Sequence, residues 1–327
     1  MKSALITGIL GQDGAYLAQL LSNKGYKVLG LIRRYSNPNF ENTNYLGITK
    51  EIEFLSGDLT DEGSLLNIIK STKPDEVYNL AAQSFVGSSW DLAKVTTETN
   101  ALGVLYLLNA IKHFSPDTKF YQASTSEMYG NFKEDFKTEE TPMHPRSPYA
   151  ISKLYSYWLT NNFKESYGMF CCNGILFNHE SPIRGKEFVT RKISLGVAKI
   201  KLGLGREIKL GSLESERDWG FAGDYVKAMW LMLQQETPDN YVIATGETHS
   251  VKDFLQEAFS FVGIKNWKTH VTVDPKFIRP AELHSLKGNA DKAKRDLKWK
   301  PVVRFSELVQ MMVEADIQRY TIKKSLG

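Results

Sequence analysis

The chain has 327 residues, of which 42% are hydrophobic and 24% are charged. This length and composition are typical of a globular protein with one large domain and a smaller one. The formal charge of +4 comes from basic residues that alternate with acidic ones and form no long run. The charge pattern argues against nucleic acid as a partner and favours a small anionic ligand.

The sequence predicts neither export nor membrane insertion. Met1 leads almost directly into ALITG, which is too short for the apolar core of a signal peptide, and no window reaches the roughly eighteen apolar residues of a membrane span. The two cysteines, Cys171 and Cys172, are adjacent in an apolar run, which suits neither a disulfide framework nor a metal site. We therefore expect a cytoplasmic protein with no membrane association and no metal.

Short β-rich runs alternate with helical patterns along the first half of the chain. The predicted strands are ALITG, YKVLGLI, EIEFLSG, EVYNLAA, KFYQAS and CNGILF. The predicted helices cover about 13–24, 61–71 and 90–114 and the segment around Tyr149. Gly25 and Pro74 are expected to end the first two helices. This alternation predicts an α/β fold with a Rossmann-type, doubly wound parallel sheet.

The second half predicts a smaller α/β lobe interleaved with the first domain. Residues 1–178 are assigned to the first domain, to which about 219–246 return as a helix and a strand, and 179–327 are assigned mainly to the second lobe. NHESPIRG is predicted to be a polar loop. We also expect core positions on the long helix and at three tryptophans, namely Leu102, Leu105, Leu108, Trp158, Trp230 and Trp299.

A glycine-rich turn links the first strand to the first helix. Gly8, Gly11 and Gly14 follow the strand directly, in the spacing GxxGxxG rather than GxGxxG. Glycines here allow a pyrophosphate to approach the backbone, and the helix N-terminus supplies N–H donors and a positive dipole. The turn predicts nucleotide binding, with a purely structural turn as the alternative.

The end of the second predicted strand favours NADP over NAD. NAD-binding chains usually carry an acidic residue there for the ribose 2′-hydroxyl, whereas this chain has Arg33 and Arg34, which suit a 2′-phosphate. Two solvated arginines are the alternative. Asp58, after the third strand, is predicted either to contact adenine or to cap the next helix.

Four residues predict the chemistry of the site. Tyr149 and Lys153 lie four positions apart, so on a helix they share a face, and the ammonium group is expected to favour the ionised phenol. Thr125 and Glu127 follow a predicted strand, where a glutamate is able to remove a proton from a carbon beside a ketone. A surface Tyr/Lys pair and a helix-capping glutamate are the alternatives.

Nine motifs occur in order between about Ser3 and Pro301: TGILGQDGAYLAQLL, YNLAAQS, STSEMYG, PRSPYAISKLYSYW, NGILFNHESP, FVTRKI, RDWGFAGDYVKAMW, ATGETHSV and RPAE. Together they resemble the GDP-mannose 4,6-dehydratase family, a branch of the extended short-chain dehydrogenases/reductases. The resemblance implies a tightly bound NADP that is regenerated in each cycle, since the reaction is redox-neutral overall. The first domain is thus expected to bind NADP and the second a GDP-sugar.

The resemblance also implies roles for individual residues. Tyr149 and Lys153 would act in oxidation at sugar C4, Thr125 would hold O4, and Glu127 would remove the C5 proton before water leaves C6. The cofactor-binding residues would be Gly8, Gly11, Gln12, Asp13, Gly14, Arg33, Arg34, Asp58, Leu59, Leu80, Ala81, Ala82, Tyr149, Lys153, Leu176, Asn178, His179 and Arg184. The substrate-binding residues would be Ser84, Asn178, Val189, Lys192, Arg217, Arg279 and Glu282.

Two residues beside the site keep more than one interpretation. Arg184, an isolated loop arginine, is either solvated or functional, and His179 is expected to be structural or substrate-orienting rather than a base. Ser126 stands where dTDP-glucose dehydratases have an aspartic acid, so Glu127 is expected to serve as both base and acid.

The chain departs from the family pattern next to the sugar. Phe85 to Trp90 replace a segment that usually begins His-Val, and LHSLKGNADKAK follows RPAE where an acidic residue is common. A different GDP-sugar, such as a GDP-heptose or GDP-hexose, is therefore a rival substrate. A second hypothesis for the function is an NADP-dependent epimerase or reductase, and a third is a catalytically silent NADP sensor.

The long polar segment 33–43 reaches a neighbouring subunit in this family, which implies a homotetramer.

Overall fold

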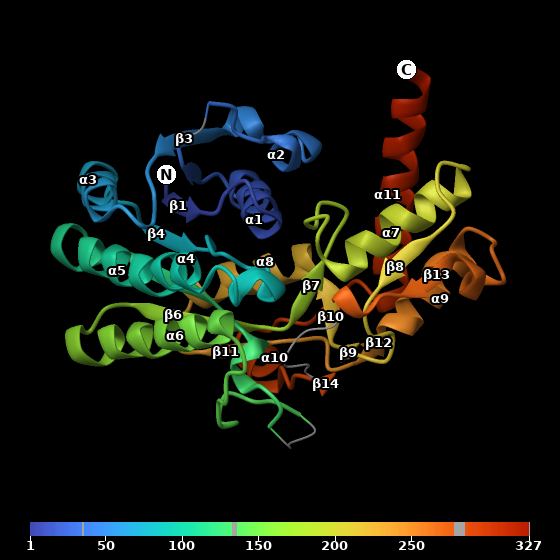
Figure 1. Ribbon diagram of the computed structural model, residues 1–327. Helices are drawn as coiled ribbons and strands as arrows, with labels where there is room; N and C mark the ends of the chain where they lie inside the picture. The colour runs from blue at the N-terminus through green and yellow to red at the C-terminus, as the bar shows by residue number, and fades with distance from the viewer. Residues whose placement is uncertain (35, 133–135, 278–284, 327) are drawn as a thin grey trace.

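The structure of the chain, a computed structural model, describes residues 1–34, 36–132, 136–277 and 285–326 (Figure 1). Figure 1 shows a large α/β part with helices on both sides of a sheet and, beside it, a smaller part from which the C-terminal helix projects. We call these parts the cofactor lobe and the second lobe. Within the described residues, no helix combines the length and apolarity that a membrane crossing requires.

The cofactor lobe is built on a seven-stranded parallel sheet with the order β11-β6-β5-β4-β1-β2-β3. Its strands are β1 (Ser3–Thr7), β2 (Lys27–Ile32), β3 (Ile52–Ser56), β4 (Glu76–Asn79), β5 (Lys119–Thr125), β6 (Cys171–Leu176) and β11 (Tyr241–Ile243). The predicted doubly wound fold is confirmed. The order reverses between β1 and β4, and ligands of such sheets bind beyond the carboxyl ends of the strands at this switch point.

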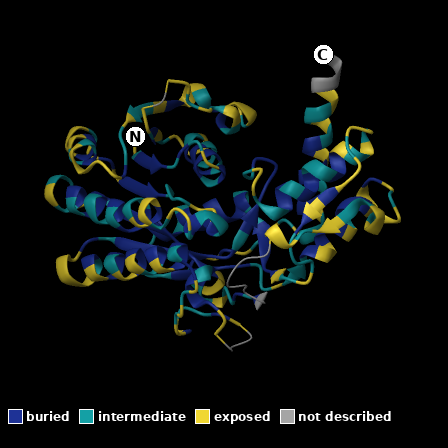
Figure 2. Ribbon diagram, in the orientation of Figure 1, coloured by how far each residue is buried: buried dark blue, intermediate teal, exposed yellow. Residues whose placement is uncertain are grey.

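Helices cover both faces of the sheet and enclose two apolar cores. On one face α1 (Gln12–Asn23) packs against α8 (Ala222–Leu233). On the other face lie α3 (Glu62–Thr72), α5 (Gly103–Phe114) and α6 (Pro148–Tyr167). The short helices are α2 (Glu41–Tyr45) and α4 (Ala93–Thr97). Figure 2 shows the inner sides of these elements as buried.

Local signals end the first two helices as predicted. Gly25 follows the C-cap Lys24 of α1 and has a φ of +77°, a left-handed conformation that glycine adopts without a Cβ penalty. Lys73 ends α3 in a left-handed conformation directly before Pro74. The N-cap of α3 is Asp61, whose carboxylate accepts from Ser64 N at 3.3 Å. Capping therefore falls to Asp61 rather than to Asp58.

The long helix predicted over 90–114 is interrupted. A π-helical turn, Glu98–Leu102, lies between α4 and α5. The wider turn rotates the side chains that follow it, and the large buried side chains of α5 are Val104, Leu107, Leu108 and Ile111. The prediction was right for Leu108, whereas Leu102 and Leu105 are only partly buried.

The three tryptophans differ in burial. Trp299 is 2% exposed and belongs to the core. Trp230 is partly buried and donates from Nε1 to Tyr26 Oη at 3.2 Å. Trp158 is 60% exposed, so its prediction as a packing residue was wrong. Its position on α6 faces outward because the inner face of the helix is taken by residues such as Tyr157 and Thr160.

The second lobe surrounds a core of its own, to which α7 (Val189–Lys201), α9 (Val251–Phe261) and α11 (Phe305–Leu326) contribute. Its strands are β7 (Asn178–Glu180), β8 (Ile208–Leu210), β9 (Glu216–Arg217), β10 (Trp219–Phe221), β12 (His249–Ser250), β13 (Val271–Val273) and β14 (Ser285–Leu286). Helix α10 (Asp291–Asp296) packs against β11 of the main sheet instead. NHESPIRG was predicted to be a loop throughout. It instead begins with β7, because Asn178–Glu180 pairs with β10 and buries two of its three side chains.

A buried ion pair joins α7 to α11. Asp316, which is 0% exposed, accepts from Arg191 Nη2 at 2.8 Å and Nε at 3.0 Å and from Ser194 Oγ at 2.7 Å. Arg191 also donates from Nη1 to the carbonyl oxygens of Pro182 (2.6 Å) and Arg184 (3.0 Å). Arg191 therefore ties the C-terminal helix to the segment that carries Arg184.

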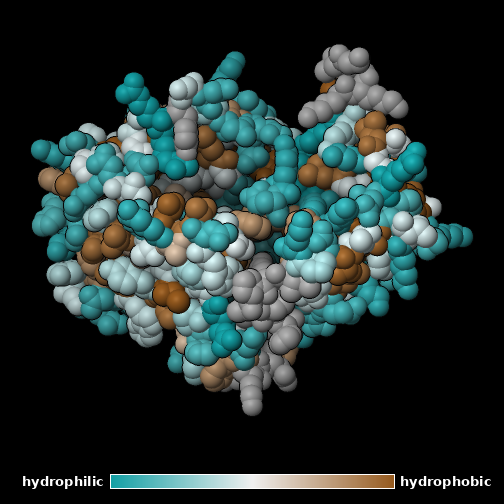
Figure 3. Space-filling view, viewed as in Figure 1, coloured by the Kyte–Doolittle hydropathy of each residue, from teal (hydrophilic) through white to brown (hydrophobic). Residues whose placement is uncertain are grey.

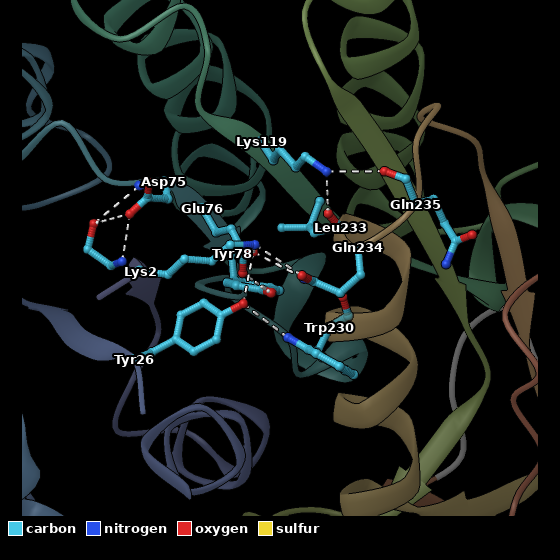
Figure 4. Close-up of polar contacts among 11 residues, drawn as sticks. Lys2, Tyr26, Asp75, Glu76, Tyr78, Lys119, Trp230, Leu233, Gln234 and Gln235 are labelled. Atoms are coloured by element: carbon cyan, nitrogen blue, oxygen red, sulfur yellow. Dashed lines mark hydrogen bonds and ion pairs between the residues drawn. The ribbon is translucent and has the colours of Figure 1, made fainter. Parts of the chain in front are cut away.

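Another buried carboxylate organises the amino ends of the central strands (Figure 4). Glu76, at the start of β4, is 1% exposed and accepts from Tyr78 Oη at 2.7 Å. It also accepts from Tyr26 Oη and Gln234 Nε2, each at 3.1 Å. Donors from β4, from the segment before β2 and from the end of α8 thus converge on one acid and satisfy it.

Candidate active site

A cavity of about 670 Å³ lies between the carboxyl edge of the main sheet and the second lobe. This volume is in the range of small-molecule sites. Fifteen of the residues predicted for the site line it: Asp13, Leu80, Ala82, Ser84, Thr125, Glu127, Tyr149, Lys153, Leu176, Asn178, His179, Arg184, Val189, Lys192 and Arg217. In the view of Figure 3, hydrophilic residues cover most of the surface and hydrophobic ones lie in small scattered groups.

Helix α6 positions Tyr149 and Lys153. Ser147 is its N-cap, accepting from Ala150 N at 3.1 Å, and Pro148 occupies the first helical position. The capped start places Tyr149 in the first turn and Lys153 one turn later on the same face. Lys153 Nζ lies 6.0 Å from the centre of the Tyr149 ring and donates to Ala123 O at 3.0 Å.

Burial dominates the electrostatics of this pair. Removal from water raises the pKa of Tyr149 to about 12, although a hydrogen bond from Thr125 opposes the shift. Burial also lowers the pKa of Lys153 to about 8. The prediction that Lys153 shifts Tyr149 to its ionised form was therefore wrong for the protein alone, because removal from water is the largest influence on the phenol and raises its pKa.

Strand β5 delivers Thr125 and Glu127 to the same cavity. Thr125 ends the strand and its Oγ1 accepts from Glu127 N at 3.3 Å, which starts a 3₁₀ turn over Ser126–Tyr129. Thr125 also hydrogen-bonds the phenol of Tyr149. The negative charge of Glu127 contributes to the raised pKa of Tyr149, so carboxylate and phenol lie within electrostatic reach. The structure thus brings the four predicted catalytic residues together.

A carboxylate–imidazole pair lies at the cofactor end of the cavity. His179 Nε2 donates to Asp13 Oδ2 at 2.7 Å, and His179 Nδ1 donates to Phe177 O at 2.8 Å. Since both ring nitrogens face acceptors, the ring is doubly protonated. Burial opposes this charge, but Asp13 raises the pKa of His179 above its ordinary value. In turn, burial acts against the carboxylate while His179 holds the pKa of Asp13 below its ordinary value. The imidazolium fits the expected non-basic role of His179.

Cations and aromatic rings alternate along the second-lobe wall. The Arg184 guanidinium lies 3.4 Å from the centre of the Phe188 ring, and its Nε is 3.0 Å from Glu180 Oε2. Lys192 Nζ lies 3.3 Å from the centre of the Phe277 ring. Burial lowers the pKa of Lys192. The neighbouring Arg217 is 7% exposed.

The glycine turn has the close contacts of a phosphate-binding cradle. Gly8 has a φ of +69°, and a Cβ there would lie 2.8 Å from Ala81 N. A Cβ on Gly14 would lie 2.3 Å from Gly8 O. Gly11 is the N-cap of α1 and provides no side-chain cap to the first N–H groups of the helix. The turn therefore fits the pyrophosphate of a dinucleotide, and no side chain at Gly8, Gly11 or Gly14 blocks the approach.

The remaining predicted cofactor residues lie outside the cavity along the same edge of the sheet. Arg33 and Arg34 follow β2 and are exposed, and Asp58 and Leu59 follow β3. Asp58 Oδ1 accepts from Thr60 N at 2.9 Å and so stabilises the turn after β3. Leu59 is 4% exposed and packs in the core. Gly8, Gly11, Gln12, Gly14 and Ala81 belong to this edge as well and do not line the cavity.

Sequence reasoning overlooked several residues that line the cavity. They include Phe177, Glu180, Phe188, Trp219 and Phe277. Phe188 immediately precedes the predicted Val189, and its position before the start of α7 was the available signal. Arg279 and Glu282 lie outside the described residues. In the described part of the chain, no group of three or more His, Cys, Asp or Glu side chains is arranged to hold a metal ion.

The chain is similar to known proteins in both sequence and fold. A family model described as GDP-mannose 4,6 dehydratase matches residues 5–312. The chain is 52% identical to GDP-mannose 4,6 dehydratase 1 of Arabidopsis thaliana, with 100% of this chain and 92% of the relative covered. It is 50% identical to the human GDP-mannose 4,6 dehydratase, with 96% and 91% covered. A structure of a dTDP-glucose 4,6-dehydratase from Streptomyces venezuelae superposes with a TM-score of 0.85 at 24% identity, covering 99% of this chain and 100% of that one, which shows the shared fold.

Proposed function

The chain belongs to the GDP-mannose 4,6-dehydratase family and is a hydro-lyase that converts GDP-mannose to GDP-4-keto-6-deoxymannose, and we propose that it does so with NADP at the cavity described above. One observation carries the proposal: Thr125, Glu127, Tyr149 and Lys153 line a single cavity with Val189, Lys192 and Arg217 of the second lobe. An oxidation site, an elimination base and a nucleotide-binding wall thus lie within reach of one substrate.

The proposed roles of the chain's residues follow from the contacts. Tyr149 Oη takes the proton of the sugar C4 hydroxyl, with Thr125 Oγ1 hydrogen-bonded beside it. NADP, when bound, would accept the hydride from C4 and return it to C6, and its oxidised form would add a positive charge that favours loss of the phenol proton. Once C4 is a ketone, the C5 proton is acidic and Glu127 removes it. Glu127 then returns a proton to the leaving C6 hydroxyl, since Ser126 offers no carboxyl group at the next position.

The test of this proposal is conversion of GDP-mannose without added cofactor. The purified protein should produce a sugar nucleotide lighter by one water, measured by mass spectrometry. Glu127→Gln should bind GDP-mannose but lose turnover by about 10²- to 10⁴-fold. Glu165→Gln, a change at an exposed residue of α6, serves as the matched control. Full dehydration by the Glu127→Gln protein would exclude the role given to that residue.

The preference for NADP is a separate proposal. Support comes from Arg33 and Arg34, which are exposed directly after β2, where the ribose of a dinucleotide lies in this fold. Arg34→Asp should weaken binding of NADPH about tenfold, the loss of one charge-assisted hydrogen bond, and leave NADH binding unchanged or improved. Equal weakening for both nucleotides, measured by fluorescence titration, would contradict the preference.

We further propose a homo-oligomer, as the family resemblance implies a tetramer. Support comes from the outer face of α6, where Ile151, Tyr155 and Trp158 are 57%, 44% and 60% exposed. Spacings of four and three residues place these side chains on one helical face, and such an apolar stripe is typical of an interface. Trp158→Glu should produce a smaller species in sedimentation velocity.

The free buried thiols of Cys171 and Cys172 fit a reducing compartment such as the cytoplasm.

A further inference from the structure

Phe85 contacts the second lobe although it belongs to the cofactor lobe. It lies between β4 and the 3₁₀ turn Val86–Ser89. Its ring meets the ring of Phe188 edge to face, with the centres 5.9 Å apart and the planes at 89°. Both residues line the cavity. The contact therefore joins the lobes beside the site.

The local structure fixes the Phe85 ring in this position. The Phe85 carbonyl oxygen accepts from Gln83 Nε2 and Ser88 Oγ, each at 3.1 Å. A Cβ on Gly87 would lie 3.2 Å from the ring, so the ring rests closely on the glycine backbone. Phe85 nevertheless remains 37% exposed. An ordered, exposed ring on a cavity wall is available to a ligand.

The partner ring is held firmly as well. Arg184 stacks on Phe188 at 3.4 Å and lies 3.0 Å from the carboxylate of Glu180, which is 2% exposed. Glu180 in turn accepts from Thr190 Oγ1 at 2.6 Å. The edge-to-face contact of Phe85 and Phe188, which we call the aromatic wall, is thus anchored on the second-lobe side by buried polar groups.

The wall lies between the two ends of the proposed substrate. Tyr149 and Glu127 lie on the cofactor-lobe side of the cavity, and Val189 and Lys192 follow Phe188 directly along α7. A nucleotide sugar that reaches from α7 to Tyr149 brings its hexose past Phe85. We propose that Phe85 is a specificity-determining residue that packs against the apolar face of the hexose and selects a neutral sugar. This inference rests on the proposed function and names the subsite of its substrate.

The chemistry of the ring explains the selection. One face of a pyranose presents carbon-bound hydrogens, which make favourable contacts with an aromatic ring. A charged substituent at the same place would lose water without gaining a hydrogen bond from the ring, which disfavours acidic sugars. Under the proposed function the nucleotide binds at Val189 and Lys192 of α7, so its affinity should not depend on this contact.

Paired titrations of GDP and GDP-mannose test the assignment. Calorimetry is performed on the full chain carrying Glu127→Gln, which prevents turnover, with and without a second substitution. Phe85→Ala should weaken GDP-mannose binding about tenfold and leave GDP binding within about twofold. Phe85→Tyr keeps the ring and should restore the affinity. Phe261→Ala, at a phenylalanine of α9 that is 41% exposed and does not line the cavity, should change neither affinity.

Two results would overturn the assignment. Unchanged GDP-mannose binding by Phe85→Ala would show that the ring does not contact the sugar, and equal weakening for GDP and GDP-mannose would show a purely structural role. Failure of the proposed function would give a different result. The Glu127→Gln protein with native Phe85 would then bind GDP-mannose no more tightly than GDP, and the protein with native Glu127 would not convert GDP-mannose.

Discussion

Removal of Asp316 should destabilise the protein strongly. The Asp316 carboxylate is 0% exposed and pairs with Arg191, whose side chain is 4% exposed, and with Arg319, whose side chain is 22% exposed. Asp316→Ala would leave the Arg191 guanidinium buried, with hydrogen bonds to the Pro182 and Arg184 carbonyls but no counter-charge. Breaking a buried pair by removing one partner costs about 3–5 kcal/mol. At about 2 °C per kcal/mol for a chain of this size, the melting temperature should fall by roughly 6–10 °C.

Differential scanning calorimetry measures this shift, and Glu53→Ala is the control. Glu53 pairs with Lys27 at 2.8 Å, but both side chains are 51% exposed, so the loss should be within about 1 kcal/mol. Asp316→Ala should also weaken GDP-mannose binding, because Arg191 connects α11 to the segment that carries Arg184. A fall in melting temperature of less than about 2 °C would refute the assignment of a strong stabilising role to this pair.

Two further predictions concern the cofactor end of the cavity. Because Asp13 raises the pKa of His179, the stabilisation from this pair is complete below the ordinary histidine pKa of about 6.5 and is lost as pH rises through the raised value. Asp13→Asn should therefore lower the melting temperature more at about pH 6 than at about pH 9, and an equal loss at both pH values would contradict the charged pair. Gly14→Ala should abolish retention of the nucleotide, measured by chromatography of the heat-released ligand, since its Cβ would lie 2.3 Å from Gly8 O. Gly203→Ala, with a φ of +70° and nothing within 4 Å of the added Cβ, should cost about 1 kcal/mol and keep the nucleotide.

The sequence predicted the features that depend on local pattern. The period of the apolar residues located the parallel strands, and glycine spacing located the turn after β1. The four-residue spacing of Tyr149 and Lys153 placed both on one face of a helix, which is α6 in the structure. Each of these features is decided within a few residues of the chain, so no knowledge of the tertiary structure is needed.

Features that depend on packing between distant segments could not be predicted. The imidazole of His179 and the carboxylate of Asp13 come from residues 166 positions apart, and no local pattern pairs them. The outward orientation of Trp158 depends on which face of α6 the sheet covers. The π turn before α5 likewise shifted the buried face by an amount that helical periodicity does not reveal.

Electrostatics in the cavity show the same dependence on tertiary structure, and Asp13 is central to them. Its negative charge supports the protonated form of Lys153 and also raises the pKa of Tyr149, so an isolated Asp13 would oppose formation of the phenolate. The imidazolium of His179, 2.7 Å away, offsets that charge. The Asp13–His179 pair therefore keeps an acidic residue at the start of α1, beside the turn that fits a pyrophosphate. Because His179 offsets its charge, Asp13 opposes proton removal from Tyr149 less than it would alone. Replacing His179 with a neutral residue would leave the carboxylate uncompensated, and on this reasoning the phenol would become a weaker acid.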